Sequence, residues 1–236
     1  IKVSYVTVLA DGTIDYSHLE TLLNPTEKTL VSLMHINNEI GTILDIQKVA
    51  NLCKSNNALF HSDSVQSVGH YYLDLQTIPI DFLAASAHKF HGPKGIGFVF
   101  IRKNSGLKPL IHGGMQERGV RAGTESIHDI VGLDESLALS YQNLEVEMTQ
   151  VKALKTYFVE KLKTTIDGVK FNGCCSDSNK STYTLVNVCL PVSEANAPMF
   201  LFQLDLKGIA CSKGSACQSG SDKGSHVLSQ ILSEAD

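Results

Sequence analysis

The sequence predicts an α/β protein whose sheet is largely parallel. Short apolar runs recur along the first hundred residues, and several end in clusters of polar side chains. Between two of these runs, apolar residues follow the three- and four-residue spacing of an amphipathic helix. After residue 123 a single helical stripe continues for about nine turns. Short buried strands that alternate with helices and loops are typical of a parallel sheet.

Five segments have the composition of β-strands: residues 1–8, 30–33, 58–61, 82–85 and 96–101. The first is rich in β-branched side chains and enters the turn Ala10-Asp11-Gly12. Three of the others end at polar clusters, namely residues 34–39, 62–63 and 86–89. Open α/β sheets bind ligands just beyond the carboxyl ends of their strands, so these clusters predict a site at that edge.

Helices are expected at residues 45–55 and, much longer, at residues 130–162. A helix of that length commonly bridges two domains, so we place the domain change near residue 145. Residues 1–145 would form a large domain, and residues 146–236 a smaller α+β domain. In the second, residues 182–190 alternate as an antiparallel strand, and Pro198 suits the first turn of a helix that ends near residue 205.

Composition excludes several classes of protein. The 236 residues are 43% hydrophobic and 19% charged with a net charge of -4, which disfavours a disordered chain, a nucleic-acid binder and a membrane-surface binder. Neither an apolar run of about 18 residues nor a signal peptide is found, and six irregularly spaced cysteines suggest reduced thiols in the cytoplasm. His88 and His91 lack further ligands at zinc-like spacing, so no metal site is predicted. Because Ile1 is not Met and a strand begins at once, we expect a fragment that begins inside a domain.

The polar cluster after the third strand contains Asp63, and the cluster after the fourth contains Lys89. A lysine can form a Schiff base with pyridoxal phosphate, and a carboxylate can keep its ring nitrogen protonated. Taken singly, Asp63 could cap a helix and Lys89 could be an ordinary surface lysine. Together they predict a pyridoxal-phosphate site.

The motifs around these two residues resemble those of the class V, fold type I pyridoxal-phosphate enzymes, and most closely the NifS/IscS-like cysteine desulfurases. The resemblance extends from about residue 5 to residue 226. It is carried by four motifs: Asn37-Asn38-Glu39-x-Gly41, Asp63-x-x-Gln66, Ser86-Ala87-His88-Lys89 with Gly92-Pro93-Lys94-Gly95, and Arg121-Ala122-Gly123-Thr124. It implies the fold type I large domain, a three-layer α/β/α arrangement, followed by a smaller α+β domain.

The resemblance also implies roles for individual residues. Lys89 would form the Schiff base, and Asp63 would pair with the pyridinium nitrogen. The other cofactor contacts would be Asn38 beside the cofactor and the substrate carboxylate, Gln66 at the ring hydroxyl, Ser86 and His88 at the phosphate, and Thr124 at the phosphate of the neighbouring subunit. Thr124 therefore implies a homodimer.

A further motif is the Gly/Ser-rich loop Ser212-Lys213-Gly214-Ser215-Ala216-Cys217. A thiol on a loop of small residues can move between a buried substrate and a partner at the surface. The loop resembles the Ser-x-Gly-Ser-Ala-Cys stretch of the same group, which identifies Cys217 as the nucleophile. Cys211 is expected to be a small residue at a strand end, and Cys53 a core residue.

The predicted reaction converts L-cysteine to L-alanine and leaves a persulfide on Cys217. The resemblance implies transfer of this sulfur to an acceptor protein, either an iron-sulfur scaffold or a sulfur carrier, for iron-sulfur cluster assembly or the thiolation of cofactors or tRNA. Two alternatives remain open: another class V enzyme, such as a selenocysteine lyase or an aminotransferase, and a non-catalytic fragment that keeps a partner-binding surface. Cofactor and catalytic segments expected at both ends lie outside these 236 residues, which is why the fragment alternative has weight.

Overall fold

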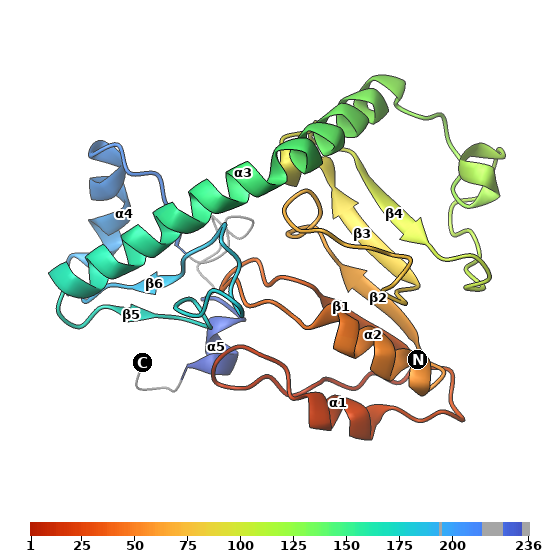
Figure 1. Cartoon of the computed structure of the whole chain (residues 1–236), viewed down its shortest axis with the longest axis horizontal. Coiled ribbons are helices and arrows are strands. Elements are labelled where there is room, and N and C mark those ends of the chain that lie inside the picture. Colours follow the sequence, from red (N-terminus) through yellow and green to blue (C-terminus); the bar gives the residue numbers. More distant parts are fainter. Residues whose placement is uncertain (194, 214–223, 233–236) are drawn as a thin grey trace. The chain divides into compact units, whose positions relative to one another are not determined.

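The computed structural model describes residues 1–193, 195–213 and 224–232 (Figure 1). The chain divides into two compact units. The first, called the sheet unit here, contains Glu20–His35 and Asp45–Glu147, and the second, called the terminal unit, contains Ile1–Leu19, Ile36–Leu44 and Met148–Asp236. The chain passes from one unit to the other at Met148, but the terminal unit also includes two N-terminal segments. The predicted domains 1–145 and 146–236 remain a prediction.

The sheet unit is built on four strands in the order β1-β2-β3-β4: β1 (Leu30–Met34), β2 (Leu59–Asp63), β3 (Phe82–Ser86) and β4 (Gly97–Ile101). The first three are parallel, and β4 runs antiparallel beside β3. Val31, Phe60 and Leu83 are buried in neighbouring strands and form part of the core. The α/β class with a mostly parallel sheet is therefore confirmed.

Helix α2 (Ile46–Ser55) begins where the sequence predicts it, because Asp45 caps it: the Asp45 carboxylate accepts a hydrogen bond from the Lys48 N–H at 2.9 Å. Its apolar residues Ile46, Val49 and Ala50 are buried together with Cys53, and the helix packs against β2. The prediction that Cys53 belongs to the core is confirmed.

The long helical stripe is confirmed as α3 (Ile127–Thr165, 39 residues), and Figure 1 shows it as one continuous helix. The remaining helices are α1 (Tyr16–Leu22), α4 (Ala197–Leu206), α5 (Leu228–Ile231) and the single-turn helices η1 (Ala87–Phe90) and η2 (Gln116–Gly119). Helix α4 has Pro198 in its first turn, as predicted. Among the described residues, no helix is both long and apolar enough to cross a membrane.

One predicted strand is absent, and another is much shorter than predicted. Residues 1–8 form no strand; only Val8 makes an isolated bridge, to Ile14, and most of this segment is exposed. Residues 182–190 contribute only β6 (Val188–Cys189), which pairs antiparallel with β5 (Lys170–Phe171). The beginning of that segment bonds elsewhere, because the Thr182 N–H donates to the Gly41 carbonyl at 2.8 Å. Cys211 is exposed and lies at no strand end.

Candidate active site

Polar residues meet at the carboxyl edge of the sheet unit. Asp63 is the last residue of β2 and Ser86 is the last of β3, two neighbouring parallel strands. Hydrogen bonds fix the chain immediately beyond the strands: the Ser64 N–H donates to the Ala84 carbonyl at 3.0 Å, and the His35 N–H donates to the Asp63 carbonyl at 2.9 Å. Because these strands are parallel, the segments that follow them begin on the same edge.

Asp63 lies at the start of a compact turn. Its Oδ1 accepts a hydrogen bond from the Val65 N–H at 3.0 Å, the local bond expected of an aspartate that opens a turn. Ser67 closes the turn, because its N–H donates to the Ser64 carbonyl at 3.0 Å. Asp63 and Gln66 are both half-buried. The turn therefore holds the Asp63 carboxylate at the strand end and leaves it partly accessible.

Lys89 lies in η1, directly after β3, and its neighbours anchor it. Ala87 and Phe90 are completely buried, whereas Lys89 is half-buried. The Nε2 atom of His70 lies 2.8 Å from the Lys89 carbonyl oxygen and donates to it in the matching tautomer. Ser140 of α3 donates its hydroxyl to the Phe90 carbonyl at 3.3 Å. The backbone that carries the Lys89 amine is thus held from two sides.

The turn after β2 packs directly against η1. Gly69 has a φ of +81°, and a Cβ there would lie 2.5 Å from the Cβ of Phe90. A side chain at Gly69 would therefore need both a strained backbone and a displaced Phe90. Neither His70 nor Gly69 was among the predicted site residues. A glycine at the end of the turn that begins with Asp63 is a signal by which Gly69 could have been found, whereas the contact of His70 with a main-chain carbonyl gives no such signal.

The remaining predicted residues have different surroundings. Ser86 is half-buried and its hydroxyl makes no capping hydrogen bond to η1, while His88 is exposed. Thr124 is exposed in the sheet unit, and Asn38 belongs to the terminal unit. Cys217 lies outside the described residues. The structure thus brings Asp63, Gln66, Ser86, His88 and Lys89 onto segments that leave the same sheet edge.

Burial shifts the pKa of two further side chains of the sheet unit. His35 follows β1 and is only 6% exposed, and this burial lowers its pKa to about 4. Its imidazole is therefore neutral at neutral pH. Burial, together with the Asp81 carboxylate, raises the pKa of Cys53 to about 12, so its thiol is an unreactive core group.

The donor set fits pyridoxal phosphate. A half-buried lysine amine can bond to the aldehyde, a carboxylate at the next strand end can hold the ring nitrogen, and the Ser86 hydroxyl can donate to phosphate. Within the part of the chain that the structure describes, no group of three or more His, Cys, Asp or Glu side chains could hold a metal ion. The residues at this edge therefore suit an organic phosphate cofactor.

Comparison with known proteins shows the family to which the chain belongs. The family model of the class-V aminotransferases matches residues 1–231, so the chain belongs to the class-V aminotransferase family, whose members depend on pyridoxal phosphate. More particularly, it is similar to proteins named cysteine desulfurase IscS. It is 38% identical to that of Dictyoglomus turgidum over 230 residues, and 40% identical to that of Clostridium botulinum over 230 residues.

Both alignments cover 98% of this chain but 57% of the relative, so the chain spans little more than half the length of these proteins. Among solved structures, a NifS-like protein superimposes with a TM-score of 0.84 at 33% identity, covering 98% of this chain and 59% of the other. A structure described as SspA in complex with cysteine gives a TM-score of 0.77 at 32% identity, covering 100% of this chain and 63% of the other. These structures share the fold described above.

Proposed function

We propose that the full-length protein is a pyridoxal-phosphate-dependent cysteine desulfurase that converts L-cysteine to L-alanine and forms a persulfide on Cys217. The observation that carries the proposal is the placement of Asp63 and Lys89 at adjacent strand ends, with His70 bound to the Lys89 carbonyl. Membership of the class-V family and similarity to proteins named cysteine desulfurase support it.

In this proposal pyridoxal phosphate, when bound, supplies an electron sink for the bonds at the substrate Cα. Lys89 holds the cofactor before substrate arrives, and its free amine then accepts the proton from the substrate Cα. The Asp63 carboxylate keeps the ring nitrogen protonated. Gln66, Ser86 and His88 hold the ring hydroxyl and the phosphate, and Asn38 orients the ring and the substrate carboxylate.

The sulfur transfer requires a thiol, which an aminotransferase would not need. The Cys217 thiolate attacks the substrate sulfur, a new S–S bond forms, and the substrate Cβ–S bond breaks. Protonation of the remaining carbon skeleton gives L-alanine, so one L-cysteine and one Cys217 thiol yield one L-alanine and one Cys217 persulfide. We assign no catalytic role to Cys211. The Cys217 persulfide would pass its sulfur to an iron-sulfur scaffold or a sulfur carrier in the cytoplasm.

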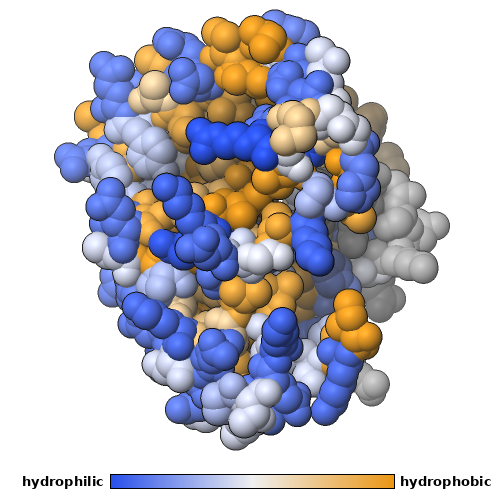
Figure 2. Space-filling view, turned by 90° about the vertical axis from the view of Figure 1, so that its right-hand side faces the viewer, coloured by the Kyte–Doolittle hydropathy of each residue, from blue (hydrophilic) through white to orange (hydrophobic). Residues whose placement is uncertain are grey.

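We further propose that two copies form a homodimer in which Thr124 contacts the phosphate of the neighbouring site. Large apolar side chains are exposed in the segments around Thr124, among them Leu110, Met115 and Ile127 at 91%, 79% and 65%. Figure 2 shows hydrophobic side chains exposed among polar ones on one face of the molecule. Burial of such side chains against a second copy would remove apolar surface from water.

The backbone conformation of the same segment also supports the proposed homodimer. Glu117 and Arg118 in η2 have φ of 49° and 55°, the left-handed region that non-glycine residues seldom adopt. Each such residue is destabilising by about 1–2 kcal/mol unless its surroundings hold it there. A second copy packed on this segment would supply those surroundings.

The test uses the full-length protein, loaded with cofactor and given L-cysteine and a reductant. Production of L-alanine with equal sulfide, and a mass increase of one sulfur on Cys217 without the reductant, are the expected results. Cys217→Ser should keep the cofactor and lose both products, whereas Cys211→Ser should keep both. Activity lost in Cys211→Ser but retained in Cys217→Ser would reject the assignment. Formation of a keto acid with no need for Cys217 would indicate an aminotransferase instead.

A further inference from the structure

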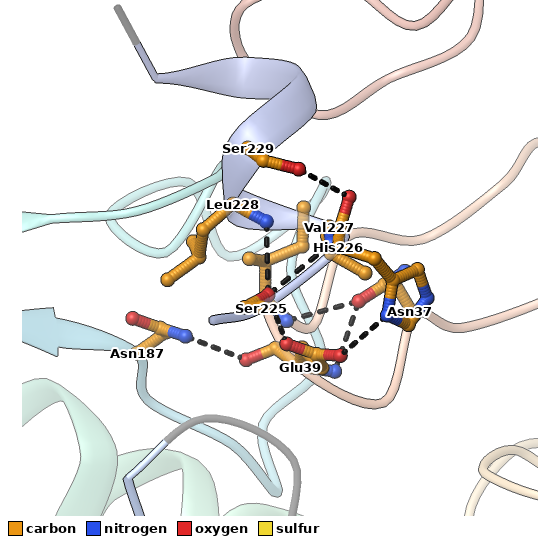
Figure 3. A network of polar contacts seen from close by, with 9 residues as sticks. Asn37, Glu39, Asn187, Ser225, His226, Val227, Leu228 and Ser229 are labelled. Carbon is orange, nitrogen blue, oxygen red and sulfur yellow. Dashed lines mark hydrogen bonds and ion pairs between the residues drawn. The ribbon is translucent and has the colours of Figure 1, made fainter. Parts of the chain in front are cut away.

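Glu39 is a buried carboxylate with partners from a distant part of the chain. Its side chain is 0% exposed, and its Oε2 accepts a hydrogen bond from the Ser225 hydroxyl, 186 residues away in sequence (Figure 3). His226 Nδ1 lies 3.7 Å from the other oxygen, Oε1. A buried carboxylate is unfavourable unless polar groups compensate it, so Glu39 favours the chain conformation that keeps residues 225–226 in place.

The Ser225 hydroxyl also caps a helix. Its Oγ accepts hydrogen bonds from the Val227 N–H at 3.2 Å and the Leu228 N–H at 2.9 Å, which caps α5. The same oxygen therefore connects the start of α5 to Glu39, as Figure 3 shows. At the other end of this short helix, Ile231 is buried.

Glu39 itself is fixed by its own turn. The Glu39 and Ile40 N–H groups donate to Asn37 Oδ1 at 2.9 and 3.0 Å, and the Glu39 carbonyl accepts a hydrogen bond from Asn187 Nδ2 at 2.9 Å. The Asn187 amide is held in turn by Asn172. Because its main chain is bound on both sides, Glu39 can serve as a fixed point for residues 225–226.

We infer that Glu39 anchors the chain at Ser225 and so fixes the downstream end of the segment that contains Cys217. Glu39 is a positioning residue in this inference. Its consequence for sulfur transfer rests on the function proposed above. Cys217 and Ser225 are eight positions apart in sequence, and an extended chain spans at most about 3.3–3.6 Å per residue, so the Cys217 Cα must stay within about 29 Å of the Ser225 Cα. Without the anchor, Ser225 itself is no longer held at Glu39, so the limit no longer ties Cys217 to a fixed point.

The anchor is tested without substrate by hydrogen exchange in the full-length protein. The readout is the peptide that spans residues 226–232, where the Leu232 N–H donates to the Leu228 carbonyl. Ser225→Ala should speed its exchange about tenfold or more, because a charge-assisted hydrogen bond and a helix cap are lost together. Ser229→Ala is the matched control: its hydroxyl donates to the His226 carbonyl and takes no part in the Glu39 contact, so exchange should change by less than about twofold.

A double-mutant cycle separates the anchor from simple helix capping. Glu39→Gln keeps the shape of the side chain and removes the charge, and we expect it to speed exchange several-fold. Combined with Ser225→Ala it should add little further, whereas with Ser229→Ala the two effects should add. Additive effects of Glu39→Gln and Ser225→Ala, or equal exchange in Ser225→Ala and Ser229→Ala, would overturn the inference. Glu39→Gln also provides the exchange test if Ser225→Ala does not fold.

Persulfide labelling of Cys217 tests whether the anchor affects the proposed sulfur transfer. Ser225→Ala should slow labelling by L-cysteine about tenfold while the cofactor absorbance stays at the wild-type level. If the wild-type protein forms no persulfide but the exchange results are as expected, the proposed function fails and the anchor stands. If labelling is normal in all variants and exchange is unchanged, the anchor fails and the proposed function stands.

Discussion

We expect His35 to make the free energy of unfolding of this protein fall at acidic pH, and the substitution His35→Gln to remove that contribution. Its imidazole follows β1, is 6% exposed and has a pKa lowered by burial from 6.5 to about 4. Among the described residues its Nδ1 has no hydrogen-bond partner. Its ring lies beside that of Tyr71, with the centroids 6.4 Å apart. Such surroundings disfavour the imidazolium form.

The sign of the effect follows from which state binds the proton first. Above about pH 6.5 His35 is neutral in both the folded and the unfolded protein, so it contributes no pH dependence. Between pH 6.5 and 4 the unfolded chain binds a proton that the folded protein does not, and stability falls as the pH falls. A difference of about 2.5 pKa units corresponds to about 3 kcal/mol, of which about 2.5 kcal/mol is lost by pH 4.5.

The assay is denaturant unfolding of the full-length wild type and of His35→Gln at about pH 7.5 and pH 4.5. The free energy of unfolding of the wild type should fall by about 2.5 kcal/mol more than that of the variant, because every other titratable group is present in both proteins. Equal pH dependence in wild type and His35→Gln would refute the argument that burial keeps His35 neutral.

Three further changes probe the site edge. Lys89→Ala in the full-length protein should abolish the borohydride-reducible link to the cofactor, whereas Lys94→Ala should retain it; peptide mapping of the link to Lys94 would contradict the assignment. Thr124→Ala should weaken cofactor retention about tenfold to hundredfold by loss of one hydrogen bond to phosphate, with no dissociation of the dimer in ultracentrifugation. Gly69→Ala should destabilise the fold by about 2–4 kcal/mol in denaturant unfolding, since it adds both a strained φ and an overlap with the phenylalanine behind it. Gly95→Ala, with a similar φ of +87° and nothing within 4 Å of its Cβ, should lose only about 1–2 kcal/mol, and equal losses would show that crowding at Gly69 is unimportant.

The sequence alone predicts those helices whose apolar pattern lies within the helix itself. The apolar spacing in 46–53 predicts α2, and the stripe in 130–162 predicts α3, because a helix satisfies its own backbone hydrogen bonds. Residues 1–8 have equally good strand composition and still form no strand. A strand needs a partner for its N–H and C=O groups, and the sequence of the segment contains no information about whether that partner is present.

The site residues also divide into those that a local sequence pattern predicts and those that it does not. Asp63, Ser86 and Lys89 could be placed at one edge because each follows a short buried strand, and parallel strands end on the same edge. His70 could not be chosen in this way. Its contact is with the main-chain carbonyl of Lys89, which every residue type possesses, so the partner leaves no trace in the sequence.

Glu39 shows why a motif can be noticed and its most informative residue still be missed. In the stretch Asn37-Asn38-Glu39 the amides attract attention, because they can face a ligand, while a glutamate in a polar cluster resembles an exposed residue. Its carboxylate accepts a hydrogen bond from Ser225, 186 residues later, and no local pattern connects the two. A carboxylate this deeply buried next to a proposed cofactor-binding residue points to a connection between the Asn38 turn and the chain that follows Cys217. The two ends of the proposed reaction, cofactor orientation and sulfur acceptance, would then depend on a single buried contact.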